Sequence, residues 1–312
     1  MVRAVKLENT PSGSYFNASQ GIFYTSNAVV IPAPAPTPSS RLVNLSVRSN
    51  AGSGSQTLIV GFVIIGSGNS GALPLLVRAT GPALEAFGVD GVLRDPILTM
   101  YKDGTIVGFN DNWGLNAAQV SAAGAAAGAF QLLSPTSADA ALTALPVSGA
   151  YSAQISGSGG ASGIALAEVY DTTPSGGYTT AMARLTNISA RTQVGTGANV
   201  LIVGFVVSGS ATEKVLVRGI GRGLEKFGVS GVLANPQLRL FASNGTVLAT
   251  NDGWGGDSSL AAVFTQVGAF ALDTTSADSA LVATLSPGAY TVQISGANGS
   301  TGVVLAEVYE VK

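Results

Sequence analysis

The chain has 312 residues and a net charge of −2, and it contains no cysteine and no histidine. These absences exclude disulfides, thiolate metal sites, histidine-ligated zinc and every catalytic arrangement that needs an imidazole. Only 10% of the residues are charged, with no basic stripe to suggest a nucleic-acid partner, and no apolar run reaches the roughly 18 residues of a membrane span.

Residues 1–40 form the first predicted region, an extended N-terminal arm. Its segment 21–31, GIFYTSNAVVI, combines β-forming and apolar residues that are unfavourable in water, and the proline-rich stretch 31–40 favours a semi-rigid spacer. We expect the segment either to pack on its own chain or to add as a strand to the sheet edge of a neighbouring subunit. The candidates for this polymer interface are Ile22, Phe23, Tyr24, Val29, Val30 and Ile31.

The start of the chain lacks the apolar segment of a signal peptide. Either the chain is cytoplasmic, or a leader was removed or lies outside this numbering, and we expect the second. Low charge, 41 glycines and short apolar segments are common in secreted surface proteins, so the composition favours an extracellular location.

The rest of the chain is one unit written twice. Residues 41–171 recur at 184–312, with a linker rich in Gly, Thr, Ser and Pro at 172–183. RLVNLSVR returns as RLTNISAR, while LIVGFV and LAEVY return unchanged. Two copies of domain size predict two domains arranged like beads on a string, and no single catalytic body.

Within each copy the pattern is that of β-strands. In residues 41–48, Val43, Leu45 and Val47 alternate with polar residues, which predicts a half-buried strand with these three facing the core. LIVGFV at 58–63 is apolar on both faces, as in a central strand, and DG at 103–104 and NG at 244–245 indicate hairpins. Short strands separated by such turns predict an all-β fold, with two homologous jelly-roll-like β-sandwich domains in tandem after the arm.

A second alternating strand places Tyr151, Ala153 and Ile155 inside, and its copy places Tyr290, Val292 and Ile294 there. Helical turns are expected at two sites in each copy. These segments are 81–89, 116–128, 221–229 and 257–268, the last capped by Asp257 or Ser258.

The repeated string RLxNxSxR…LIVGFV…FGVxGVL…NDxW…SADxAL…GAYxxQISG…LAEVY resembles a module of large secreted proteins of environmental bacteria. The later part of each copy, from NDxW to LAEVY, is also similar to bacterial pre-peptidase C-terminal domains. The resemblance covers 41–171 and 184–312 but not the arm. It implies an extracellular accessory or structural β-sandwich and carries over no catalytic residue.

The NDxW segments are the most ligand-like part of the sequence. Trp113 and Trp254 are candidates for stacking on a sugar, and a buried core position is the alternative for both. Asp111 and Asp252 are candidates for Ca²⁺, although each segment supplies only two or three of the six to eight oxygen ligands that calcium takes. The expectation is therefore no cofactor, with calcium as a minor alternative.

Acidic and arginine residues recur at matched positions of the two copies. As catalytic groups, Asp111 and Asp139 or their copies would have to converge in a pocket; as structural groups, the carboxylates would pair with arginines and brace loops. A site present in both copies of a repeat favours the structural role. The recurring residues are Arg41/Arg184, Arg48/Arg191, Arg78/Arg218, Glu85/Glu225, Asp111/Asp252, Asp139/Asp278 and Glu168/Glu307.

Together these patterns predict a non-enzymatic, extracellular bacterial structural protein. We expect a subunit of a surface filament or surface layer, assembled with copies of itself by strand addition of the arm and by packing between domains. The alternative is a carbohydrate-binding or adhesion module of a larger secreted protein, with polysaccharide as its partner.

Overall fold

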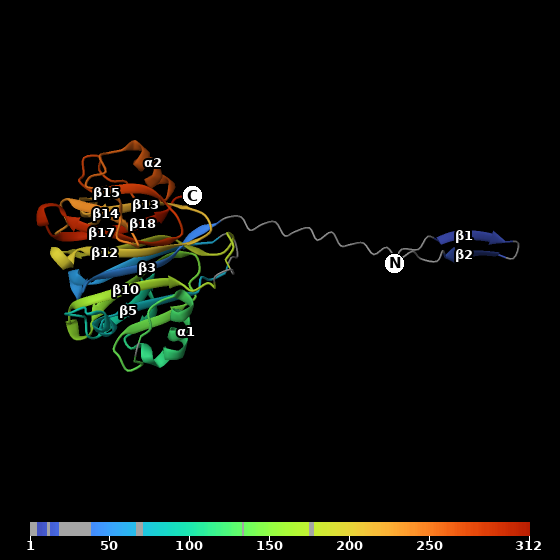
Figure 1. Ribbon diagram of the computed structural model, residues 1–312, viewed down its shortest axis with the longest axis horizontal. Helices are drawn as coiled ribbons and strands as arrows, with labels where there is room; N and C mark the ends of the chain where they lie inside the picture. The colour runs from blue at the N-terminus through green and yellow to red at the C-terminus, as the bar shows by residue number, and fades with distance from the viewer. Residues whose placement is uncertain (1–4, 11–12, 19–38, 67–70, 133, 175–177) are drawn as a thin grey trace. The chain divides into compact units, whose positions relative to one another are not determined.

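The computed structural model describes residues 5–10, 13–18, 39–66, 71–132, 134–174 and 178–312 (Figure 1). The chain divides into two compact units, residues 1–37 and 38–312. In the first, strands β1 (Val5–Thr10) and β2 (Gly13–Ala18) pair as an antiparallel ribbon. The six residues predicted to form a polymer interface, from Ile22 to Ile31, lie outside the described residues.

The second unit is all-β, as the sequence predicts, and its sixteen strands form two layers of eight joined at one point, where Leu42 pairs with Leu185. The first layer runs in the order β15 (Val247–Asn251), β14 (Pro236–Ala242), β17 (Gly288–Gly296), β12 (Leu201–Gly209), β3 (Ser40–Ala51), β10 (Gly163–Asp171), β5 (Leu75–Thr80) and β8 (Ala140–Ala144). The second runs in the order β7 (Thr105–Asn110), β6 (Pro96–Lys102), β9 (Gly149–Gly157), β4 (Leu58–Ile65), β11 (Arg184–Val194), β18 (Gly302–Glu310), β13 (Glu213–Ile220) and β16 (Ser279–Leu285).

Each layer takes half of its strands from each sequence copy. Strand β3 of the first copy pairs with β12 of the second, from Arg48 opposite Ile202 onward. Strand β11 of the second copy pairs with β4 of the first in the equivalent register, from Arg191 opposite Ile59. Strand pairing therefore joins the two sandwiches edge to edge in both layers, and the copies form one compact body, not the separate beads that the repeat suggested.

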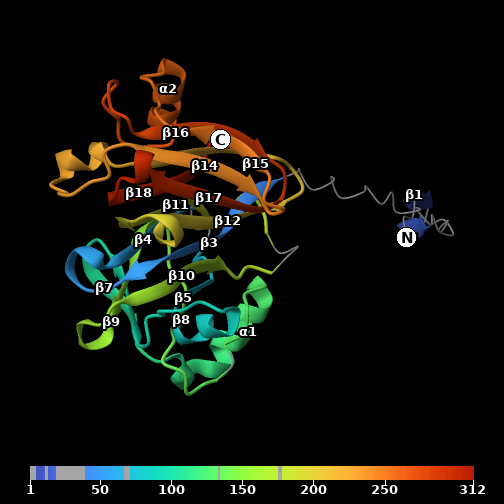
Figure 2. The ribbon, with the colours of Figure 1, turned by 60° about the vertical axis from the view of Figure 1, so that its left-hand side comes forward.

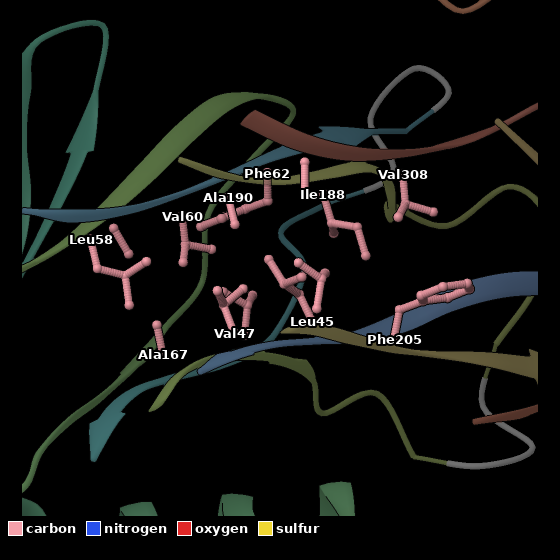
Figure 3. Close-up of a cluster of buried hydrophobic side chains, with 14 of the residues drawn as sticks. Leu45, Val47, Leu58, Val60, Phe62, Ala167, Ile188, Ala190, Phe205 and Val308 are labelled. Carbon is pink, nitrogen blue, oxygen red and sulfur yellow. The ribbon is translucent and has the colours of Figure 1, made fainter. Parts of the chain in front are cut away.

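One hydrophobic core runs through both copies between the layers. Figure 3 shows Val60 and Phe62 of β4 and Ile188 of β11 facing Leu45 of β3 and Phe205 of β12. Alternation places these side chains inside, since successive residues of a strand point to opposite faces. The predicted inward residues of β9 and β17 lie in this core or pack against it.

The prediction that Val43 faces the core is wrong, because a β-bulge changes the alternation. Leu42 and Asn44 lie opposite consecutive residues of β12, so that Val43 is the extra residue. Leu42, which is fully buried, takes the core position. Thr186 is the extra residue at the same point of β11. A bulge inserts one residue and reverses the facing of those before it, and the alternation alone does not reveal it.

Glycines allow the two copies to approach closely where they pair. Gly61 of β4 lies opposite Ser189 of β11, and Gly204 of β12 lies opposite Ser46 of β3. A Cβ atom on Gly61 would stand 2.5 Å from Ser189 Oγ, too close for an unrelaxed contact. The central glycine of both LIVGF segments is thus explained by the serine of the other copy.

Helices cover the outer faces of the layers. Helix α1 (Ala117–Ala127) and helix α2 (Ser258–Gln266) lie at opposite sides of the body, α1 near β8 and α2 near β16 (Figure 2). The side chain of Asp257 accepts hydrogen bonds from the amides of Ser259 and Leu260, which confirms it as the cap of α2. The segments 81–89 and 221–229 contain the 3-10 helices η2 (Pro82–Phe87) and η6 (Arg222–Phe227). Among the helices described here, none has the length and apolar character to cross a membrane.

Candidate functional site

The predicted sugar platforms are buried. Trp113 and Trp254 are 2% and 4% exposed, each under the helix of its own copy. The indole nitrogen of Trp113 donates to the Ser134 carbonyl and to Ser137 Oγ, and that of Trp254 does the same with Asp273 and Ser276. A ring stacks on a sugar only with an exposed face, so the sugar-stacking interpretation of both tryptophans is wrong and the core alternative applies.

Asp139 locks the loop that holds Trp113. The carboxylate is fully buried and accepts hydrogen bonds from the amides of Gly81 and Ala83 and from Ser137 Oγ. Its own carbonyl accepts from the Trp113 amide. Every carboxylate oxygen thus has a structural partner. Asp278 accepts the equivalent backbone hydrogen bonds in the second copy.

Asp111 and Asp252 are exposed in the turns before the tryptophans, whereas Asp139 and Asp278 are fully buried. Catalysis by Asp111 with Asp139 would need a carboxylate that a substrate can reach, whereas Asp139 is buried and both of its oxygens accept internal hydrogen bonds. In the part of the chain that the structure describes, no three acidic side chains converge as a metal site would require. Calcium at Asp111 or Asp252 remains only a sequence-based expectation.

Arg78 and Glu168 form a buried ion pair beneath α1. Arg78 Nε lies 2.9 Å and Nη2 2.5 Å from Glu168 Oε2, and Nη1 donates to the carbonyl of Phe130. Tyr170 donates to Glu168 Oε1 at 2.5 Å. Burial raises the pKa of Glu168 and of Tyr170, and the Arg78 guanidinium opposes the rise in both.

Arg218, Glu307 and Tyr309 repeat this cluster under α2, with Arg218 donating to the carbonyl of Phe270. Two further matched pairs, Arg41 with Asp171 and Arg184 with Glu310, join strand ends near the crossing of β3 and β11. Each of these arginines is paired with a carboxylate, and Glu310 Oε1 is the one buried oxygen of the four carboxylates that lacks a hydrogen-bond donor. A perturbed carboxyl in an open pocket would indicate catalysis, but these lie in closed, paired environments and fit the structural alternative.

The described surface offers two features that sequence reasoning missed. One is an open cleft of about 480 Å³ in the second copy, lined by charged and hydroxyl residues that include Arg222, Glu225, Lys226, Asp273 and Thr275. The first copy has Pro82 and Ala86 at the positions of Arg222 and Lys226. An alignment of the two copies in the sequence would have shown that these two basic residues occur only in the second copy.

The other feature is an apolar surface at the first copy's end of the sandwich. Five large hydrophobic residues are exposed there, on β7 or on the turn after β8, and we name them the β7 patch: Ile106, Val107, Phe109, Leu145 and Val147. Asn110 Oδ1 accepts a hydrogen bond from the Ala141 amide, so that β7 and β8 lie side by side. Strand β7 pairs only with β6 among the described strands, so no described strand forms a ladder with its other edge.

No family model matches the sequence, and no curated protein matches it. Among solved structures, the chain is similar to tandem CBM51 modules of the family 98 glycoside hydrolase from Streptococcus pneumoniae, with 8% identity, a TM-score of 0.23 and 83% of each chain covered. Two crystal forms of PNGF-II show 11% identity with TM-scores of 0.21 and 0.19; 87% and 89% of this chain match 60% and 63% of theirs. Scores this low say nothing about a shared function.

Proposed function

We propose that this protein is a non-enzymatic structural subunit of an extracellular bacterial filament or surface layer. The observation that carries the proposal is the pairing of strands across the copies, β3 with β12 and β11 with β4. A force applied to one copy is transmitted to the other through two sets of main-chain hydrogen bonds and one continuous core. A flexible linker alone would let the copies separate, whereas a shared sandwich resists stretching as a unit.

The buried charges support the same proposal. In both copies, the buried arginine and glutamate bond to each other, and the buried aspartate accepts hydrogen bonds from loop amides. Such duplication suits a scaffold, because a catalytic centre requires free groups converging on a substrate. The arm, with its apolar segment 21–31, would add as a strand to a neighbouring subunit, as expected from its sequence.

The test is negative-stain electron microscopy of the full chain beside a chain that lacks residues 1–40. Filaments from the full chain alone would support assembly through the arm. Dispersed particles from both chains, at all concentrations, would contradict the filament proposal. Filaments from both would contradict the role of the arm and retain assembly by the folded body.

A carbohydrate-binding or adhesion role is the second proposal, and the cleft beside η6 favours it. Arg222, Glu225 and Asp273 present donors and acceptors around about 480 Å³, room for a polar ligand the size of a sugar ring or two. The first copy offers a matched control because it lacks both basic residues. Calorimetric titration with acidic and neutral glycans, on the wild type and on Arg222→Pro, tests it. Equal heats from both proteins would contradict binding in this cleft.

A further inference from the structure

The β7 patch is not required by the fold. At the equivalent positions of the second copy, Phe109 is replaced by Thr250, Leu145 by Thr284 and Val147 by Ser286. All six of these residues are exposed. The second copy makes the same hairpin and the same sandwich with the polar set. Folding therefore does not explain why the first copy exposes three apolar side chains there.

The five residues of the patch lie on two elements that come close at this corner, although no strand ladder joins β7 to β8. Asn110 lies beside Ala141, and a Cβ atom on Gly108 would stand 3.2 Å from Leu142. The two strands thus run antiparallel, so that Ile106 lies toward the end of β8, where Leu145 follows. β7 carries no charged residue and no proline, which are common means of protecting an exposed edge.

The other end of the sandwich presents the matching edge. Strand β15 is the equivalent of β7 and pairs only with β14 among the described strands. It exposes Val247 and Leu248 and is likewise uncharged. β7 and β15 stand at the two ends of the strand order, so each molecule carries one apolar edge at each end.

We propose that the β7 patch of one molecule docks against the β15 edge of a second copy of this chain. The inference rests on the filament proposal and names the contact between folded bodies. Edge-to-edge contact is already how the two copies join within the molecule, where β12 pairs with β3 and β4 with β11. A contact between two different ends is heterologous, and it propagates a linear chain when the rotation between successive molecules does not close a ring.

The contact is made chiefly by side chains. Val107 and Leu248 are the extra residues of matching bulges in the two hairpins. A bulge interrupts the regular ladder, which disfavours continuous strand addition at these edges and leaves apolar packing as the main attraction. Because Val107 and Leu248 are exposed on the two strands, they are the positions to label.

The chain has no cysteine, so single substitutions report the contact cleanly. The full chain carrying Val107→Cys is mixed with the full chain carrying Leu248→Cys, oxidised, and analysed on a non-reducing gel. The mixture should give a covalent dimer that neither variant gives alone to the same extent, and the double variant should give a ladder. Strong dimer formation by Val107→Cys alone would show a symmetric contact and overturn the proposal.

A second set of variants uses the residues of the other copy. Phe109→Thr, Leu145→Thr and Val147→Ser together should reduce the yield of the ladder at least fivefold, with unchanged tryptophan emission as the check of folding. Leu115→Thr, at a side chain that is 89% exposed elsewhere in the first copy, is the control for general loss of apolar surface. An unchanged ladder in the triple variant would overturn the proposal.

Microscopy of the same samples separates the two proposals. Filaments that form without any cross-link between the Val107→Cys and Leu248→Cys variants would retain the filament and reject this contact. A ladder of short oligomers without filaments would retain the contact and reject the filament.

Discussion

Replacing Leu45 by alanine tests whether the two copies fold as one body. Leu45 is fully buried on β3, where it lies opposite Phe205 of the second copy and Val169 of the first. Truncating a buried leucine to alanine typically costs about 2–5 kcal/mol, from lost burial and from the cavity that remains. We expect about 3 kcal/mol here, which is roughly a hundredfold shift of the unfolding equilibrium.

The chain offers one fluorescent reporter for each copy. Trp113 lies in the outer cluster of the first copy and Trp254 in that of the second. Trp254→Phe and Trp113→Phe each leave a single tryptophan, and urea unfolding is followed with and without Leu45→Ala in both backgrounds. Because Leu45 packs on both copies, both reporters should show the same loss of stability, at coincident midpoints.

Two further variants calibrate this experiment. Ile188→Ala changes the residue of β11 that is equivalent to Leu45, so it should act on both reporters alike. Leu115→Ala, at an exposed side chain, should shift neither by more than about 0.5 kcal/mol. If Leu45→Ala moved the transition of Trp113 and left that of Trp254 in place, the copies would be independent and the argument from strand pairing across the copies would fail.

The remaining predictions concern buried charge. Arg78→Met should destabilise by about 3–5 kcal/mol at pH 8, because it leaves Glu168 buried without its cation. Burial already raises the pKa of Glu168, and loss of Arg78 removes the main opposing influence. A carboxyl whose pKa is raised in the folded state binds more protons when the protein is folded than when it is unfolded. The Arg78→Met variant should therefore be least destabilised near pH 4.5 and should lose stability as the pH rises. Urea midpoints of the variant that do not change with pH would contradict this. Arg78→Met combined with Glu168→Leu should recover most of the loss at pH 8 in the same assay, and equal loss in the single and double variants would contradict the pairing. Asp139→Ala should cost about 2–4 kcal/mol in urea unfolding, since the amides of Gly81 and Ala83 lose their acceptor, and a loss below about 1 kcal/mol would show that water replaces it.

Local features of the fold could be predicted from the sequence because they depend on neighbouring residues. Alternation placed Leu45 and Ile155 in the core, Asp103-Gly104 gave a hairpin, and Asp257 capped α2. The core positions depend on the two-residue period of a strand, the hairpin on residues that adopt a left-handed turn, and the cap on amides close in sequence. The buried pairs of Arg78 with Glu168 and of Arg218 with Glu307 fit the structural role expected from their recurrence, whereas the recurring Glu85 and Asp111 are exposed.

The sequence by itself determined an all-β chain with one unit written twice, since the strand periodicity and the repeat are both readable in one dimension. Only the tertiary structure decided which copy supplies each strand, because identical LIVGFV segments allow pairing within a copy or between copies, and the two choices differ in contacts far apart in the chain. It also decided that Trp113 is buried and that Phe109 is exposed. Both residues are aromatic and lie in the same short segment, and only the packing of α1 and the place of β7 at the end of its layer distinguish them.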